Sequence, residues 1–144
     1  MTWPVPAPGL VIRYSYLWRR EFLVGREEGV KDRPCAIVAV VADDEGERHV
    51  LVLPVTHVPP EAPAEAVEMP AATKRRLGLD DERSWIILAE ANEFVWPGPD
   101  LRPQPGRGTE SVALGFLPPA LFRQVRDGFL ALDQRRKAGV VPRT

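Results

Sequence analysis

Residues 33–56 read RPCAIVAVVADDEGERHVLVLPVT, and this stretch decides the fold. The residues on either side of its centre are apolar and rich in Val and Ile, which is typical of β-strands. Residues 43–47, at the centre, combine acidic side chains with a glycine that tolerates positive φ, as hairpin turns require. We therefore expect two antiparallel strands, at 33–42 and 49–56, joined by a turn.

Short strands are predicted on both sides of this hairpin. One is 10–18, which is rich in β-branched and aromatic residues. The other strands are expected at 66–69, 84–91, 93–96 and 111–117, and polar or proline-rich connections at 19–32, 58–64 and 97–109. Pro54 cannot donate to a sheet ladder, so we expect an edge or a bulge at that point.

Two segments have the pattern of helices. Residues 70–77 begin with a proline that suits the first helical position, and Gly78 follows as a stop signal. Residues 119–137 carry an apolar face with spacings of three and four, formed by Leu121, Phe122, Val125, Phe129 and Leu132.

These elements predict a mainly β protein, a small antiparallel SH3-like barrel with one short helix and a C-terminal amphipathic helix. A ferredoxin-like α+β sandwich is the alternative, but it requires a second long helix. We expect one domain over 1–144, with an extended tail at 1–8 and another tail at 138–144.

Composition narrows the class of protein. The 144 residues carry a formal net charge of −1, which excludes a strongly basic nucleic-acid binder, although residues 13–33 hold six basic side chains against four acidic ones. The single cysteine, Cys35, lies in an apolar run and is interpreted as a small buried hydrophobe. With no apolar run of about 20 residues and no signal-like N-terminus, we expect a cytoplasmic protein without a membrane span.

Several common chemistries lack their motifs. Clustered Cys and His ligands are absent, so no metal is expected, and Asp80-Asp81-Glu82 is interpreted as a solvated turn. Phosphate-binding glycine loops and the GxSxG pattern are also absent, so no cofactor is expected.

A pair of polar residues remains at the far ends of the central hairpin. If 33–42 and 49–56 pair through the turn, Arg33 and Thr56 become neighbours. A guanidinium holds phosphate oxygens and stabilises developing negative charge, and a hydroxyl positions the phosphate. His57 follows directly and is interpreted either as a proton-transfer group or as a surface loop residue.

The ordered set of motifs resembles the MazF/PemK toxin family. The run 25–38 is similar to the family's loop, Arg-Pro and apolar strand, and Pro54-Val55-Thr56-His57 resembles its second block. Gly9 with strand 10–18, the run 84–90 and the C-terminal helix fit the same order. This resemblance implies a CcdB/PemK-like barrel, a homodimer and an antitoxin partner. It also implies a metal-independent endoribonuclease that uses the 2′-hydroxyl of single-stranded RNA and leaves a 2′,3′-cyclic phosphate.

Site residues follow from this resemblance. Arg33 matches the family's catalytic arginine and Thr56 its catalytic hydroxyl residue. Weaker candidates for substrate contacts are Glu28, Lys31, His57, Glu90 and Asn92. The aromatic candidates for base stacking, for each of which core packing is the alternative role, are Trp18, Phe22, Phe94 and Trp96.

Two other functional classes stay open. A non-catalytic barrel of the same kind would bind a protein or nucleic acid, and this class includes toxins that poison a topoisomerase through the C-terminal helix. An unrelated β-barrel module is the remaining alternative. The joint presence of Arg33 and Thr56 favours catalysis, because a binding module needs neither.

Overall fold

The central hairpin organises the computed structural model of the chain. Strand β2 (Asp32–Ala42) and strand β3 (Arg48–Thr56) pair antiparallel, as predicted. In the turn, the Asp43 backbone N–H donates to the Glu47 carbonyl at 2.8 Å, and Gly46 adopts a φ of +83°. The structure describes residues 2–27, 29, 31–135 and 138–143.

The other elements surround this hairpin. In chain order they are β1 (Leu10–Ser15), α1 (Arg19–Leu23), the 3-10 turn η1 (Pro63–Glu65), β4 (Ala66–Glu68), α2 (Ala71–Arg76), β5 (Trp85–Ile87), β6 (Glu90–Trp96), the 3-10 turn η2 (Thr109–Val112), β7 (Ala113–Phe116), α3 (Pro119–Gln134) and β8 (Gly139–Pro142).

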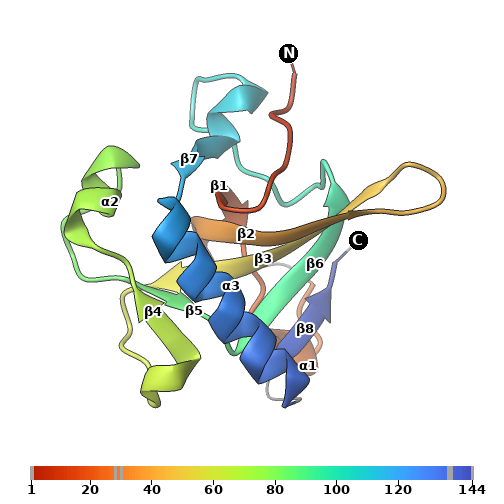
Figure 1. The fold of residues 1–144 in the computed structure, drawn as a ribbon. Coiled ribbons are helices and arrows are strands. Elements are labelled where there is room, and N and C mark those ends of the chain that lie inside the picture. Colours follow the sequence, from red (N-terminus) through yellow and green to blue (C-terminus); the bar gives the residue numbers. More distant parts are fainter. Residues whose placement is uncertain (1, 28, 30, 136–137, 144) are drawn as a thin grey trace.

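The described strands form one eight-stranded, mainly antiparallel sheet (Figure 1). Strand β3 has two partners on its second edge: its first part pairs with β6, and its end pairs with β5. Pro54 lies between these two pairings, where no ladder partner needs its missing N–H. This change of partner lets the end of β3 leave the main sheet and carry Thr56 to a rim.

The predicted fold class is confirmed: the chain is mainly antiparallel β, with a longer C-terminal helix. The hydrogen-bonded strand order of the described residues does not close into a ring. The strand predicted at 84–91 is interrupted at Leu88 and Ala89, which divides it into β5 and the start of β6. The segment predicted as a strand at 111–117 begins with η2 instead.

Two elements lie in segments that the sequence predicted to be irregular. Helix α1 interrupts the expected connection 19–32, where the Glu21 carboxylate accepts the Trp18 backbone N–H at 3.1 Å. Strand β8 lies in the expected tail 138–144 and pairs with β6 in parallel orientation. Both are too short for a periodic pattern, and β8 depends on a partner far away in the sequence.

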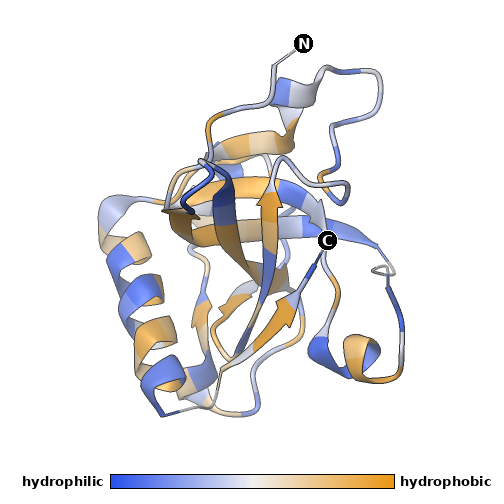
Figure 2. Cartoon of the chain, turned by 90° about the vertical axis from the view of Figure 1, so that its right-hand side faces the viewer, coloured by the Kyte–Doolittle hydropathy of each residue, from blue (hydrophilic) through white to orange (hydrophobic). Residues whose placement is uncertain are grey.

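The buried residues form two clusters, one on each face of the sheet. Helix α3 covers one face, and its apolar residues pack there with residues of β1, β3 and β5. Along α3 hydrophobic and hydrophilic residues alternate, as expected for a helix with one buried face (Figure 2). The second cluster, called the aromatic cluster below, contains four buried aromatic residues among aliphatic ones, with Tyr14 stacked on Phe94 at a centroid distance of 4.9 Å. No described helix has the length and apolar character needed to cross a membrane.

Arg143, next to β8, ties the C-terminal segment to β1. Its side chain is 4% exposed and forms an ion pair with Asp100 at 2.8 Å. The same guanidinium donates to the Ser15 carbonyl and to the Asn92 side-chain oxygen, both at 3.0 Å. Because Asn92 also bonds the backbone of Leu17, this network fixes the chain just before Trp18.

Candidate functional site

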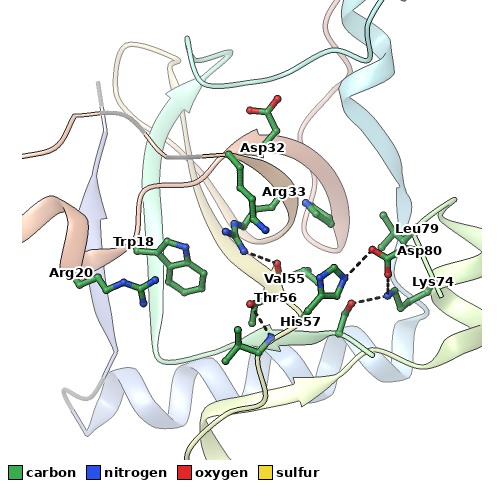
Figure 3. Close-up of a pocket in the computed structure, with 14 residues that line it drawn as sticks. Trp18, Arg20, Asp32, Arg33, Val55, Thr56, His57, Lys74, Leu79 and Asp80 are labelled. Atoms are coloured by element: carbon green, nitrogen blue, oxygen red, sulfur yellow. Dashed lines mark hydrogen bonds and ion pairs between the residues drawn. The ribbon is translucent and has the colours of Figure 1, made fainter. Parts of the chain in front are cut away.

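A hollow of about 350 Å³ opens where β2 begins and β3 ends (Figure 3). The pairing of Cys35 with Pro54, continued by two residues, places Arg33 opposite Thr56. The Arg33 Nη1 donates to the carbonyl of Val55 at 3.4 Å, and Arg33 and Thr56 both line the hollow. The hairpin therefore brings together the two residues that the sequence singled out.

The Arg33 guanidinium is half-buried and has unused donors. It lies 5.0 Å from the centre of the Trp18 ring, and Arg20 lies 5.3 Å from the same ring. Among the described residues, the Nε of Arg33 is a buried side-chain nitrogen that has no hydrogen-bond partner. Burial lowers the pKa of Arg33, but an arginine stays protonated in proteins. A cation with donors to spare therefore lies beside Thr56.

Asp32 does not neutralise this cation, although it precedes Arg33 directly in the chain. Successive side chains of a strand point to opposite faces. The Asp32 carboxylate forms an ion pair with Arg102 at 3.5 Å. Within the described part of the chain, Arg33 forms no ion pair with a carboxylate.

Thr56 is the last residue of β3 and is partly exposed. Its backbone pairs with Trp85 of β5, which fixes the position of the hydroxyl group at the rim. The Thr56 Oγ1 accepts the backbone N–H of Val58 at 3.2 Å. Because the oxygen is used as an acceptor, the hydroxyl proton is available to a ligand in the hollow.

His57 belongs to a hydrogen-bonded chain of side chains on the other wall. Its Nε2 lies 2.9 Å from an oxygen of the Asp80 carboxylate, and the second Asp80 oxygen lies 2.6 Å from the Lys74 ammonium. No described residue bonds the Nδ1 of His57. The hydrogen bond from Lys74 holds the pKa of Asp80 below its usual value, so this carboxylate is ionised near neutral pH.

Lys74 anchors this wall from inside the protein. It is 3% exposed and also donates to the Ser84 hydroxyl at 2.7 Å and to the carbonyl of Glu82. A buried ammonium with three oxygen partners is fully satisfied. The orientation of Asp80, and through it that of His57, is therefore set by the interior of the protein.

One group of described side chains has the geometry to hold a cation. His57, Asp80 and Glu82 each offer one ligand atom, and these atoms lie within 4.8 Å of one another. All three residues are exposed, and Asp80 already bonds the Lys74 ammonium. A metal ion would have to compete with that ammonium for the same carboxylate.

The weaker candidates have different positions. Lys31 is exposed and lines the hollow with Arg33, and Glu90 lines an adjoining hollow with Thr56. Asn92 lines neither hollow, because it is fully buried. Its side-chain oxygen accepts the Leu17 backbone N–H, and its side-chain NH₂ donates to the Leu17 carbonyl. Its role is to hold the chain before Trp18. Glu28 lies outside the described residues.

The four aromatic candidates also divide. Trp18 lines both hollows, and the guanidinium groups of Arg33 and Arg20 lie over its ring. Phe94 and Trp96 are buried in the aromatic cluster, and Phe22 is exposed and lines neither hollow. Cys35 is fully buried, and burial raises the pKa of its thiol, as expected for a packing residue.

Sequence reasoning missed Lys74, Asp80 and Arg20 as members of the site. They come from α2, from the loop after it and from α1, and no local motif connects them to Arg33. No protein-family model and no curated protein matches this chain. The function is therefore inferred from the geometry of the hollow and from the order of the motifs along the sequence.

Proposed function

We propose that this chain is an endoribonuclease of the MazF/PemK type that cleaves single-stranded RNA in the hollow between Arg33 and Thr56. The observation that carries the proposal is the Arg33 guanidinium, which has unused donors, lies beside a hydroxyl and a histidine, and has no carboxylate partner among the described residues. A phosphodiester supplies the negative oxygens that such a group binds.

The reaction uses a nucleophile of the substrate itself. The 2′-hydroxyl oxygen bonds to the adjacent phosphorus while the bond from phosphorus to the 5′-oxygen breaks, which leaves a 2′,3′-cyclic phosphate. Arg33 stabilises the charge on the non-bridging oxygens, and the Thr56 hydroxyl donates to one of them. His57 accepts the 2′-hydroxyl proton at Nδ1, and the departing 5′-oxygen takes a proton from water.

We expect the Thr56→Val variant to cleave about a hundredfold more slowly, because valine keeps the shape of threonine but cannot donate to the phosphate. The measurement is the cleavage rate of a long end-labelled single-stranded RNA, with the 3′ ends of the products analysed for a cyclic phosphate. Thr56→Ser retains a hydroxyl and is expected to recover most of the activity. Wild-type protein that leaves this RNA intact would overturn the proposed cleavage.

The same assay with EDTA tests the expectation that no metal is needed. We expect unchanged cleavage after chelation, because Arg33 already supplies the positive charge at the phosphate. Loss of activity on chelation, restored by added divalent ions, would instead assign a metal role to His57, Asp80 and Glu82.

We expect Asp80→Asn and His57→Ala each to slow cleavage by about a hundredfold. The buried Lys74 ammonium has to face the amide oxygen of the new side chain, so the amide NH₂ is directed at His57 Nε2. The imidazole then carries its proton on Nδ1, where it can no longer accept one. The matched control is Asp81→Asn, an adjacent exposed acid. Equal cleavage rates for Asp80→Asn, His57→Ala and Asp81→Asn would show that His57 takes no part in the reaction.

The proposal includes the homodimer and the antitoxin partner that the resemblance implies. Light scattering on the purified protein is expected to give twice the protomer mass of 16.1 kDa. A mass of one protomer would remove the dimer from the proposal and leave the cleavage chemistry to be judged by the RNA assay.

A further inference from the structure

A second hollow, of about 470 Å³, adjoins the first. The two share Trp18, Arg20, Thr56 and Val58, so they meet at the residue that we place at the phosphate. The second hollow continues along the start of β6 and the proline-rich loop after β3. An RNA strand whose phosphate lies at Thr56 therefore has one neighbouring nucleotide beside this hollow.

The walls of the second hollow suit a flat, partly apolar ring. Pro59, Pro60 and Ile87 provide apolar surface, and Trp18 provides an aromatic one. Bases stack on aromatic side chains irrespective of their sequence. The shape and apolar surface of this hollow are thus compatible with a base, and its polar groups decide which base.

Those polar groups differ in charge from the groups of the first hollow. The first is lined by the cations Arg20, Lys31, Arg33 and Lys74, which outnumber its two carboxylates, Asp32 and Asp80. In the second, Arg20 is the only cation among the described lining residues, and the carboxylates are Glu61, Glu65 and Glu90. Phosphate is therefore favoured in the first hollow, and groups that donate hydrogen bonds are favoured in the second.

Glu90 is the best-positioned of these acceptors. Its Oε1 accepts the Tyr16 hydroxyl at 3.0 Å and the Arg19 backbone N–H at 2.9 Å, so the carboxylate has a fixed orientation. No described residue donates to its Oε2. Burial raises the pKa of Glu90, because the surroundings compensate its charge only in part. A ligand that donates to Oε2 would supply the missing stabilisation.

We infer that the second hollow binds the nucleobase next to the cleaved phosphate and selects bases with an exocyclic amino group over uracil. The inference rests on the proposed function for the position of the phosphate. Adenine, cytosine and guanine each carry an NH₂ group that can donate to the Glu90 oxygen, whereas the donor of uracil on the same edge, N3–H, lies between two carbonyl oxygens. A carboxylate that approaches this N–H is repelled by the oxygens on both sides of it, so uracil satisfies the Glu90 acceptor less well.

The experiment compares RNA oligonucleotides that carry each of the four bases at the positions on either side of the cut. At one of the two positions, we expect uracil to lower kcat/KM by about 5- to 150-fold in the wild type. The Glu90→Gln variant keeps the acceptor for Tyr16 and Arg19 but presents an NH₂ group in place of Oε2. We expect it to cleave the uracil substrate better than the wild type does, and the other substrates less well.

Glu93→Gln is the matched control, because Glu93 lies on the same strand and lines neither hollow. It is expected to keep the wild-type base preference. A wild type that cleaves all four bases equally at both positions, or a Glu90→Gln variant with unchanged preference, would overturn the inference and leave the proposed function intact.

A binding assay separates the two proposals. Fluorescently labelled oligonucleotides with 2′-deoxyribose throughout cannot form the cyclic phosphate, and their affinity is read by anisotropy. Weaker binding when deoxyuridine replaces the preferred base, and loss of this difference in Glu90→Gln, would support the second hollow even if RNA is not cleaved. Equal affinity for all bases would overturn it whatever the outcome of the cleavage assay.

Discussion

Replacing Arg33 with alanine is expected to lower the rate of RNA cleavage by about a thousandfold. The variant removes the positive charge beside Thr56, and no other arginine projects from the start of β2. Because the Arg33 guanidinium is half-buried with an unsatisfied Nε, its removal also relieves a desolvation penalty. We therefore expect the loss of activity with little change in the midpoint of thermal unfolding.

Two further variants make this result specific. Arg33→Lys keeps the charge but lacks the planar fork, so it is expected to recover only part of the rate. Arg83→Ala is the matched control, because Arg83 lies over Trp85 at 5.0 Å, the same distance that separates Arg33 from Trp18. Arg83 does not line the first hollow, and its variant should cleave normally. Equal rates in the Arg33 and Arg83 variants would exclude Arg33 from catalysis.

Replacing Arg143 with alanine is expected to lower the free energy of unfolding by about 3–5 kcal/mol, the usual effect of removing one partner of a buried ion pair. The variant deletes the 2.8 Å ion pair to Asp100 and the hydrogen bonds to Ser15 and Asn92. Urea unfolding followed by tryptophan fluorescence measures the change, since Trp18 lies close to the network.

Arg135→Ala is the control for this loss. Arg135 is exposed at the end of α3, and such substitutions usually change stability by less than about 0.5 kcal/mol. A double-mutant cycle with Asp100→Ala isolates the pair from the rest of the network. Equal unfolding midpoints for the Arg143 and Arg135 variants would show that β8 is held by its backbone pairing with β6 alone.

Local patterns predicted the strands that form the hairpin and the two helices with clear start and stop signals. Strands β2 and β3 lie within one residue of their expected bounds, and α2 ends just before Gly78. Helix α1 was missed because none of its five residues is buried, so it has no apolar face to reveal it. Strand β8 was missed because β6, the strand with which it pairs, is distant in sequence.

The same distinction applies to the candidate site. The meeting of Arg33 and Thr56 follows from hairpin register, which a sequence can reveal. The Lys74–Asp80–His57 chain could not be predicted, because it depends on β5 pairing with the end of β3 and carrying the preceding loop to His57. Glu90 and Asn92 lie two residues apart on β6, yet only the tertiary structure distinguishes the residue that lines a hollow from the buried one.

The position of Arg143 also orders events during translation. The contacts that fix the chain before Trp18 run from Leu17 to Asn92 and from Asn92 to Arg143. The ribosome adds Arg143 long after Arg33 and Thr56, so the network that holds the chain before Trp18 is complete only once Arg143 has been made. If the chain cleaves RNA, this part of its scaffold is therefore completed well after the two residues proposed to act on the phosphate.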